Sequence, residues 1–558
     1  MENRSWHQHY DYHVNTDLRV PRIPIQHFLD IPANLYPDKA AIHFLGTQIS
    51  FWELREFSLR MANALKSLGI EKGDRIGIHL INIPQYVMTY YAAVSLGAIV
   101  VNFNPIYTAD ELKSLIKQTD ITAIITMDIA MDVIKEVLSE VNIPNVIVTS
   151  AFDFKDGVNP TTAQSLGLEK EWHHFSELLE NFPQPDPVNI TISSEDPALI
   201  QFTGGTTGLP KGAVLTHRNV VGSVISSSLW GESITRLVMP ENRSVMCALP
   251  LFHVYANILC MNWAMYNCAT LILVPRFEIN KFMEILAGYE KITFLPAVPT
   301  MINAIINHPR AKEIQLGKKI DMLNSGGGPI PVDLITQVKK LGITCSEGWG
   351  MSETTSIGIA NPVLGLKKLG SIGIPAPGMD IKLVDIDTGE QEVPQGEPGE
   401  LLVKGPYVMK EYWNNPEKTK AELKDGWLST GDIVTMDEDG YLFIVDRKKD
   451  MIIAGGYNIY PRDIDEVLYK HPGVLEAISV GVPHEYRGET VKAFVVLKEG
   501  EAADENEIID FCKKSLAAYK VPKIVEFCSE LPKSGVGKIL RKVLRDREIA
   551  QFNKDKGT

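Results

Sequence analysis

The chain has 558 residues, of which 45% are hydrophobic and 22% charged, and its formal net charge is −14. A chain of this length exceeds a single hydrophobic core, because such cores stop growing at roughly 250–300 residues, so at least two domains are expected. The acidic balance, with no basic stripe interleaved with aromatic residues, excludes a general polyanion binder and argues against nucleic acid as a partner.

Cysteine usage and the N-terminus both indicate a cytoplasmic protein. The six cysteines form no CxxC pair and have no histidine cluster beside them, which favours buried thiols over a zinc site or a disulfide framework. Residues 1–22 are polar and lack the apolar segment of a signal peptide. The most apolar run, residues 87–101, falls short of a membrane helix.

Helical and strand patterns alternate in the first part of the chain. Residues 51–68 predict a helix, 76–80 a buried strand, 111–118 a helix and 123–126 a strand. This alternation is typical of parallel sheets covered by helices. Residues 150–187 are mostly polar and end in a proline-rich stretch, which predicts a connector or a surface excursion.

A second set of alternating strands and helices is expected from about residue 196 to 365. Short strands separated by glycine-rich turns follow, and they predict an antiparallel unit, a small β-barrel, before residue 446. After that position the pattern changes to helix 462–469, strands 477–480 and 491–497, helix 505–518 and strand 524–527. These last elements predict a compact α+β unit of its own.

The most informative segment is the loop 203–212, which follows the apolar strand 198–202 and holds four glycines, three threonines and Lys211. Glycines let backbone N–H groups turn toward one anion, while hydroxyls add donors and the lysine adds charge, as a polyphosphate requires. A Walker A loop is disfavoured, because that motif needs Gly-Lys-Ser/Thr running into a helix, whereas a strand is predicted directly after Gly212. The alternative is a flexible surface turn.

This loop resembles the phosphate loop of the adenylate-forming superfamily, which comprises acyl-CoA synthetases, peptide-synthetase adenylation domains and luciferases. Gly204 departs from the serine of many members and is similar to the long-chain acyl-CoA synthetases. The resemblance continues in order from about residue 51 to 541, through Pro250–Tyr255, Ser325–Pro329, Glu347–Thr354, Asp425–Pro461 and Leu531–Arg541. The chain is most similar to bacterial long-chain fatty acyl-CoA synthetases, chiefly through its block from Asp425 to Pro461.

The resemblance implies a role for each matched residue. Lys538 is the catalytic lysine, Glu353 binds Mg²⁺ together with Thr206, and His253 lies beside the substrate carboxylate. Trp349 stacks on adenine, and Asp432, with Arg447 beside it, holds the ribose hydroxyls. The full set implied to bind ATP or AMP is Thr203, Gly204, Gly205, Thr206, Thr207, Gly208, Lys211, Gly327, Gly328, Glu347, Gly348, Trp349, Gly350, Ser352, Asp432 and Arg447.

The resemblance also implies the fold and the division into domains. It is an α/β fold whose large N-terminal domain, residues 1–445, has two α/β subdomains and a small β-barrel. Residues 446–450 form a hinge around Lys449, and residues 451–558 form a small α+β domain that rotates. The rotation would withdraw Lys538 and bring Gly455 and Gly456 to the path of coenzyme A.

The implied activity is ATP-dependent ligation of a medium- to long-chain fatty acid to coenzyme A through an acyl-adenylate, with Mg²⁺ as cofactor and AMP and pyrophosphate released. Alternatives are transfer of the adenylate to a carrier protein or to oxygen, or activation of another acid such as an aryl acid. A catalytically silent nucleotide-binding protein is a further alternative, but it would be expected to lack Lys538, Glu353 or Asp432, and all three are present.

The sequence leaves two questions about partners open: whether the protein forms a homodimer, and what the basic run 533–547 contacts. A homodimer is implied only by the resemblance to long-chain members. The basic run 533–547 could contact coenzyme A phosphates or an anionic membrane, which would place the protein peripherally on its inner face, or it is a solvated helix face. Asp546 and Glu548 interrupt the positive charge and favour the solvated face.

Overall fold

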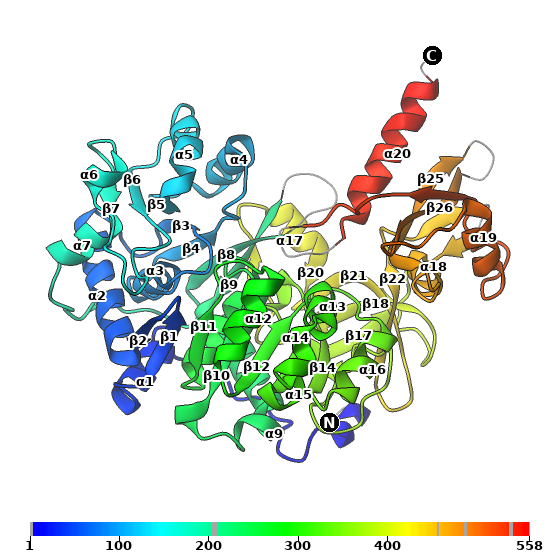
Figure 1. The fold of residues 1–558 in the computed structure, drawn as a ribbon, viewed down its shortest axis with the longest axis horizontal. Coiled ribbons are helices and arrows are strands. Elements are labelled where there is room, and N and C mark those ends of the chain that lie inside the picture. The colour runs from blue at the N-terminus through cyan, green and yellow to red at the C-terminus, as the bar shows by residue number, and fades with distance from the viewer. Residues whose placement is uncertain (1–3, 204–209, 455–456, 485–487, 535–538, 557–558) are drawn as a thin grey trace.

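The computed structural model describes residues 4–203, 210–454, 457–484, 488–534 and 539–556. Figure 1 shows a large N-terminal body, coloured from blue to yellow, and a small C-terminal domain in orange, from which the last helix projects. Two large sheets and one small sheet build the body, and a further sheet builds the C-terminal domain.

The first α/β subdomain is built on an eight-stranded sheet in the order β19-β9-β8-β4-β3-β5-β6-β7. Strands β3 to β8 pair in parallel, and β9 and β19 extend one edge with antiparallel pairing. The strands are β3 (Arg75–His79), β4 (Ile99–Asn102), β5 (Ala123–Met127), β6 (Asn145–Thr149), β7 (His173–His174), β8 (Pro197–Thr203), β9 (Lys211–Thr216) and β19 (Glu411–Tyr412).

Helices cover both faces of this sheet, because alternate strand residues point to opposite sides. Val100 packs in the same apolar cluster as α2 and α3, whereas Ile99 and Val101 pack with α4 and α5. Helix α2 begins at Ser50, whose side chain accepts the backbone N–H of Glu53 in a capping box. The helices are α2 (Phe51–Ser67), α3 (Pro84–Ser95), α4 (Ala109–Thr119), α5 (Met131–Leu138), α6 (Ala163–Leu166) and α7 (Phe175–Asn181).

The segment 150–187 is more ordered than its composition predicted. Strand β7 pairs with β6 and extends the sheet, and α7 buries Phe175 against the main core. His174, the last residue of β7, accepts the backbone N–H of Glu177 and thereby caps α7. The prediction of a connector or surface excursion therefore missed α6, β7 and α7, where a few buried side chains outweigh a polar composition.

The second α/β subdomain contains a nine-stranded sheet in the order β16-β15-β14-β13-β12-β10-β11-β1-β2. Its strands are β1 (Ala40–Phe44), β2 (Thr47–Ser50), β10 (Ser244–Cys247), β11 (Thr270–Leu273), β12 (Ile292–Ala297), β13 (Ile320–Ser325), β14 (Thr344–Trp349), β15 (Ile359–Ala360) and β16 (Ile374–Pro375). Its helices are α1 (His27–Leu35), α8 (His217–Trp230), α9 (Glu232–Thr235), α10 (Val254–Ala256), the π-helix η4 (Asn257–Asn262), α11 (Trp263–Tyr266), α12 (Ile279–Gly288), α13 (Pro299–Asn307), α14 (Arg310–Glu313), α15 (Leu316–Lys319) and α16 (Val332–Lys340).

Helix α3 joins the two subdomains and is buried almost throughout. A helix that is apolar on all sides belongs inside a core rather than on a surface. Two of its tyrosines find partners in the second subdomain, since the Tyr86 hydroxyl donates to the Leu251 carbonyl and the Tyr91 hydroxyl donates to Asn262 Oδ1. The two large sheets consequently share one continuous hydrophobic core.

The segment predicted as a small β-barrel is a five-stranded antiparallel unit, in which β17, β18, β21 and β20 follow one another and β22 pairs with β21. Its elements are β17 (Asp380–Val384), β18 (Gly399–Lys404), α17 (Pro416–Glu422), β20 (Leu423–Lys424), β21 (Trp427–Met436) and β22 (Leu442–Arg447).

The C-terminal domain is an α+β unit with its own apolar interior. Its elements are β23 (Ile452–Ala454), β24 (Tyr457–Ile459), α18 (Pro461–Leu468), β25 (Val474–His484), β26 (Gly488–Leu497), α19 (Glu505–Lys513), β27 (Ile524–Phe527) and α20 (Arg541–Lys556). The buried clusters of this domain contain only residues from Ile452 onward, separate from the core of the body. The predicted α/β fold with a small α+β C-terminal domain is therefore confirmed.

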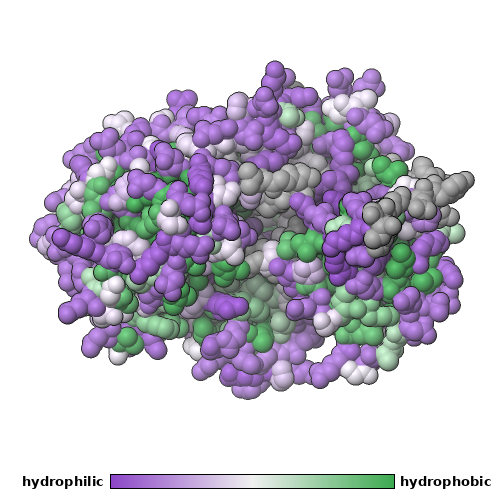
Figure 2. Space-filling model, turned by 90° about the horizontal axis from the view of Figure 1, so that it is seen from above, coloured by the Kyte–Doolittle hydropathy of each residue, from purple (hydrophilic) through white to green (hydrophobic). Residues whose placement is uncertain are grey.

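Three further observations concern the cysteines, membrane-spanning helices and the molecular surface. All six cysteines are free thiols, four of them buried. Among the residues described, no helix is both long and apolar enough to cross a bilayer. Figure 2 shows that the face seen from above is mostly hydrophilic, with its hydrophobic side chains in separate groups.

Candidate active site

The matched motifs gather where neighbouring strands end. Strands β13 and β14 are parallel, and Ser325 pairs in register with Glu347, so the loops 325–329 and 347–354 lie side by side. Ligands of open α/β sheets bind outside the carboxyl ends of such strands. Gly327 follows β13 with a φ of +78°, a backbone conformation that residues with a side chain rarely adopt. Gly328 continues the same loop.

One wall of the site consists of Trp349, Asp432 and Arg447. Asp432 and Arg447 are cross-strand partners on β21 and β22, and Arg447 Nε lies 2.7 Å from Asp432 Oδ1. The Trp349 indole N–H donates to Asp432 Oδ2 at 2.8 Å. The Asp432 charge raises the pKa of Arg447. Both oxygens of Asp432 therefore have a partner, which fixes the orientation of a carboxylate that is only 2% exposed.

The indole of Trp349 is itself held in place. A Cβ atom added at Gly358 would lie 2.6 Å from Cζ3 of Trp349, so the ring packs directly against glycine backbone. Gly348 and Gly350 flank the tryptophan in the same loop. This packing leaves Trp349 buried at 8% exposure, with its N–H committed to Asp432.

A second part of the site carries the groups predicted to meet phosphates. Lys211 begins β9, and its Nζ lies 2.9 Å from Glu422 Oε1. Glu353 lies in the 3₁₀ turn η5 (Ser352–Thr354) and is 5% exposed, and this burial raises the pKa of its carboxyl. Ser352 opens that turn and is half-buried.

The two parts are electrostatically continuous. The charge of Glu353 acts on Arg447, and the charges of Asp432 and Lys211 both act on Lys449. Burial and the nearby Arg447 charge lower the pKa of Lys449. Positive and negative side chains therefore alternate across the two parts, and Lys211, Arg447 and Lys449 are the cations that can meet an anionic ligand within a chain of net charge −14.

Glu347 lies deeper than its predicted role suggests. It is 7% exposed, and burial raises the pKa of its carboxyl to about 7, although the charge of Arg462 in the C-terminal domain opposes the shift. Its backbone carbonyl accepts the N–H of Asn361.

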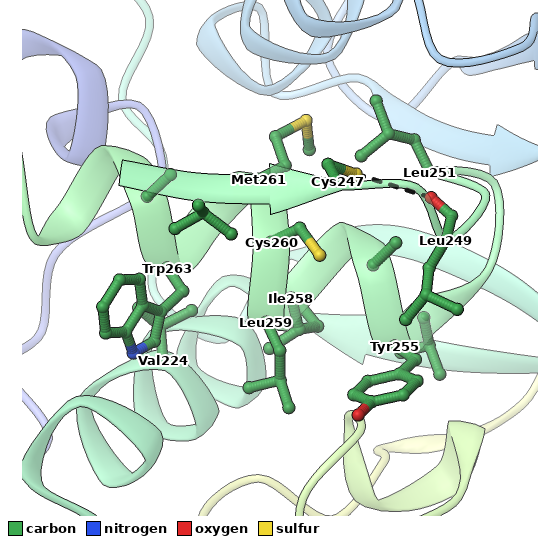
Figure 3. Close-up of a cluster of buried hydrophobic side chains, with 14 of the residues drawn as sticks. Val224, Cys247, Leu249, Leu251, Tyr255, Ile258, Leu259, Cys260, Met261 and Trp263 are labelled. Carbon is green, nitrogen blue, oxygen red and sulfur yellow. Dashed lines mark hydrogen bonds between the residues drawn. The ribbon is translucent and has the colours of Figure 1, made fainter. Parts of the chain in front are cut away.

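The third part is the loop that leads into His253 and the π-helix η4. His253 caps α10, and its Nδ1 accepts the backbone N–H of Tyr255 at 3.3 Å. The Tyr255 hydroxyl donates to Asn324 Oδ1 at 2.6 Å, which ties this loop to the end of β13. Figure 3 shows the apolar side chains of the following turns, among them Leu259 and Trp263, with Val224 of α8 beside the Trp263 indole. These side chains give the loop of His253 an apolar backing.

Three buried polar side chains hold the loop 249–253, and the sequence did not identify them. Asn82 Nδ2 donates to the Leu249 carbonyl at 2.8 Å, and the Tyr86 hydroxyl donates to the Leu251 carbonyl at 2.8 Å. Gln201 Nε2 donates to the Phe252 carbonyl at 3.1 Å, while its Oε1 accepts from Asn102. Gln201 is two residues before Thr203, so it links the strand of the phosphate loop to the residue beside His253.

Tyr412 and Glu422 were also missed. They lie more than fifty residues from Glu353 in sequence and carry no motif of their own, yet the Tyr412 hydroxyl contacts both Glu353 and Glu422. Only the pairing of β19 with β9 brings them to the site.

Several predicted residues lie outside the described ranges. They are Gly204, Gly205, Thr206, Thr207, Gly208, Gly455, Gly456 and Lys538. Their roles stay predictions.

The first two residues of the predicted hinge 446–450 end β22, and residues 448–450 form a turn. The Lys449 carbonyl accepts a hydrogen bond from Arg545 of α20 at 2.8 Å, and Arg541 contacts Asp446 at 3.6 Å and Asp450 at 3.8 Å. The described cations of the basic run pair with carboxylates of the chain itself; they are Lys533, Arg541, Lys542, Arg545 and Arg547. Of the three alternatives for this run, internal pairing supports a solvated, locally neutralised helix face.

Comparison with known proteins places this site in a family. The AMP-binding enzyme family matches residues 29–413, and the AMP-binding enzyme C-terminal domain matches residues 463–538. A long-chain-fatty-acid–CoA ligase of Bacillus subtilis (strain 168) is 38% identical over 562 residues, covering 98% of this chain and 99% of that protein. A feruloyl-CoA synthase of Amycolatopsis sp is 33% identical over 517 residues, covering 92% of this chain and 97% of that protein.

A solved structure agrees with these matches. ATP-bound MatB from Rhodopseudomonas palustris superposes with a TM-score of 0.82 at 30% identity, covering 94% of this chain and 99% of its own. The resemblance inferred from the motifs is confirmed over nearly the whole chain. From the order and extent of these matches, the chain belongs to the AMP-binding enzyme family.

Proposed function

We propose that this protein ligates a medium- to long-chain fatty acid to coenzyme A through an acyl-adenylate, consuming ATP and releasing AMP and pyrophosphate. The observation that carries the proposal is the hydrogen-bonded wall of Trp349, Asp432 and Arg447. This wall lies within electrostatic reach of the part of the site that holds Glu353 and Lys211. One side suits a nucleoside and the other suits phosphates. The long-chain-fatty-acid–CoA ligase of Bacillus subtilis supports the choice of acid and acceptor.

The chemistry has two steps. A carboxylate oxygen attacks the α-phosphorus of ATP, the bond to pyrophosphate breaks, and AMP becomes a good leaving group on the acyl carbon. The thiol of coenzyme A then attacks that carbon, loses its proton, and expels AMP as the thioester forms. The protein contributes positioning and neutralisation of charge.

In this scheme the chain's own residues divide the work. Asp432 accepts the ribose hydroxyls, with Arg447 and Trp349 holding it in place. Lys211 and the phosphate loop neutralise the phosphates, His253 lies beside the acyl carboxylate, and Lys538 stabilises the charge that shifts during adenylation.

A magnesium ion fits the residues of this site. Glu353 supplies a buried carboxylate, and the described residues contain no group of three His, Cys, Asp or Glu side chains able to form an all-protein cage. Mg²⁺ in nucleotide sites is commonly held by one or two carboxylates together with substrate phosphates. Glu353, with Thr206, would hold the ion, which when bound offsets the negative charge of the phosphates.

The proposal is tested by pyrophosphate exchange over acids from acetate to oleate, with ferulate included, followed by measurement of coenzyme A thiol consumption. Maximal exchange and thiol loss with a medium- or long-chain acid are expected. Exchange without thiol loss would contradict the acceptor and favour a carrier protein. Ferulate is included because of the Amycolatopsis relative, and a preference for it would move the substrate to aryl acids.

Substitution of Gln201 with leucine should raise the KM for the acid roughly tenfold, since it leaves the Phe252 carbonyl and the Asn102 amide buried without a partner. Glutamate at 201 keeps the acceptor for Asn102 and should have a smaller effect. Exchange kinetics at saturating ATP measure the change. An unchanged KM in both variants would contradict the prediction that Gln201 positions the His253 loop for binding of the acid.

Substitution of Lys449 with proline should slow thioester formation more than adenylation. The hinge must absorb a change in backbone dihedral angles between the two steps, and proline fixes φ near −65°. The two half-reactions are measured separately, the second with preformed acyl-adenylate. Unimpaired thioester formation would contradict the hinge at Lys449.

The homodimer, the cytoplasmic location and contact with the inner face of a membrane stay predictions. The internal pairing of the basic run gives no support to membrane contact through α20.

A further inference from the structure

Tyr412 occupies a central place between the two charged groups predicted to meet magnesium and phosphate. Its hydroxyl lies 2.9 Å from Glu353 Oε1 and 2.5 Å from Glu422 Oε2, so one phenol proton is shared between two carboxylates. Glu422 Oε1 in turn lies 2.9 Å from Lys211 Nζ. A continuous chain of contacts therefore runs from Glu353 through Tyr412 and Glu422 to Lys211.

The fold explains why these residues meet. Strand β19 pairs with β9, with Tyr412 opposite Ala213, so the tyrosine lies close to the start of β9 at Lys211. The chain then turns into α17, and the Tyr412 backbone N–H donates to Thr419 Oγ1 of that helix at 2.9 Å. Helix α17 ends at Glu422, and this position brings the Glu422 carboxylate into contact with Lys211.

The arrangement also pairs the Lys211 ammonium with Glu422 and not with Glu353. The Lys211 ammonium lies 4.9 Å from the centroid of the Tyr412 ring, on which a cation is attracted to the π electrons. Burial opposes ionisation of Glu422, but hydrogen bonds from Lys418, Tyr412 and Lys211 outweigh it and lower its pKa. Glu353 thus meets a neutral hydroxyl and is left available to a cation.

We propose that Tyr412 and Glu422 are positioning residues for the magnesium complex of ATP. The Tyr412 phenol orients the Glu353 carboxylate, and Glu422 holds the Lys211 ammonium. The carboxylate that would meet magnesium and the ammonium that would meet phosphate are therefore fixed relative to each other before ATP binds. The inference rests on the proposed use of ATP and deepens it. Neither residue is predicted to touch the reacting atoms, and both act through Glu353 and Lys211.

A purely structural role is the competing explanation, because Tyr412 is 2% exposed and also secures α17. The two explanations differ in what they affect. Loss of a structural tie weakens both half-reactions and the fold together. Loss of a positioning group weakens nucleotide binding and adenylation, and spares the conversion of preformed acyl-adenylate to thioester, which needs neither pyrophosphate nor its metal.

The test uses the full chain with Tyr412→Phe, which keeps the ring under Lys211 and removes only the hydroxyl. Affinity for Mn²⁺–ATP is measured by electron paramagnetic resonance, independently of turnover, and the half-reactions are measured separately. Hydrogen bonds to charged groups are the stronger kind, so the Kd should rise roughly tenfold or more, with adenylation falling in parallel. Thioester formation from preformed acyl-adenylate should change by less than about twofold.

The matched control is Tyr407→Phe. Tyr407 is fully buried nearby, and its hydroxyl donates to the Pro377 carbonyl at 3.1 Å, away from the charged groups. It should leave the Mn²⁺–ATP affinity unchanged. Glu422→Gln, which keeps a partner for Tyr412 and discards the charge that holds Lys211, should weaken nucleotide binding as well.

Equal loss in both half-reactions, or an unchanged Kd for Mn²⁺–ATP in Tyr412→Phe, would overturn the inference. Failure of the proposed function looks different, because the wild-type protein would then form no thioester with any acid, while the Mn²⁺–ATP comparison between wild type and variants would still decide the roles of Tyr412 and Glu422.

Discussion

Replacement of Asp432 with alanine should lower kcat/KM for ATP by about 10³-fold, since hydrogen bonds to a charged group are each worth about 1.5–3 kcal/mol and two ribose hydroxyls would lose theirs. The substitution also leaves the Trp349 N–H and the Arg447 guanidinium without the carboxylate that now contacts both. Arg447 would then be free to move into the space of the nucleoside. Binding of ATP by calorimetry and pyrophosphate exchange both measure the loss.

Two comparisons separate the ligand contact from the structural one. Asp432→Asn keeps the shape but loses the charge, and it should retain part of the binding. Trp349→Phe keeps an aromatic ring but removes the N–H donor to Asp432 together with the second ring of the indole, and its effect should stay near tenfold. An Asp432→Ala protein that binds ATP as tightly as the wild type would sink the assignment of this carboxylate to the ribose.

Replacement of Lys538 with alanine should reduce adenylation by about 10²–10³-fold, the range seen when one preset electrostatic contact to a transition state is removed. Conversion of preformed acyl-adenylate to thioester should continue at nearly the wild-type rate, because the predicted rotation of the C-terminal domain would withdraw this lysine before that step. Both half-reactions are measured on the same preparation.

The neighbouring residues provide a matched control for this experiment. Lys533 and Ile539 form an antiparallel bridge, and the Leu540 N–H donates to the Pro532 carbonyl, so the segment that contains Lys538 starts and ends at fixed points. Lys533 itself pairs with Glu476 at 2.6 Å. Lys533→Ala should therefore leave both half-reactions intact. Equal loss of both steps in Lys538→Ala would remove its special role in adenylation.

The parts of the fold that local pattern determines were predictable. The helix from Phe51 carries its own capping box, and strands such as β3 and β5 are short apolar runs bounded by turn residues. Helix 505–518 was predicted too long, since α19 ends at Lys513. The C-terminal part of that segment continues as turns, and sequence periodicity alone places helix ends poorly.

The residues of the candidate site likewise fall into those that the sequence reveals and those that only the structure reveals. Asp432 and Arg447 could be found because each lies in a dense motif, although their direct ion pair depends on the register of β21 and β22. Tyr412, Glu422 and Gln201 could not be found, because their importance comes from neighbours distant in sequence. A tyrosine before a loop or a glutamine in a strand has no local signature, and only the packed sheet reveals its partner.

The separate cores of the two domains have a consequence for the equilibrium between their orientations. A rotation about the predicted hinge would leave both apolar interiors closed, and the contacts it would exchange include polar ones, such as those of Arg545 with the Lys449 carbonyl and of Arg462 with the Ile444 carbonyl. Such contacts are replaced in part by water, so the net cost of breaking each is small. If the domain rotates as predicted, two orientations of similar free energy would be repopulated by modest differences in ligand affinity, and we expect the bound nucleotide to select the half-reaction that the protein performs.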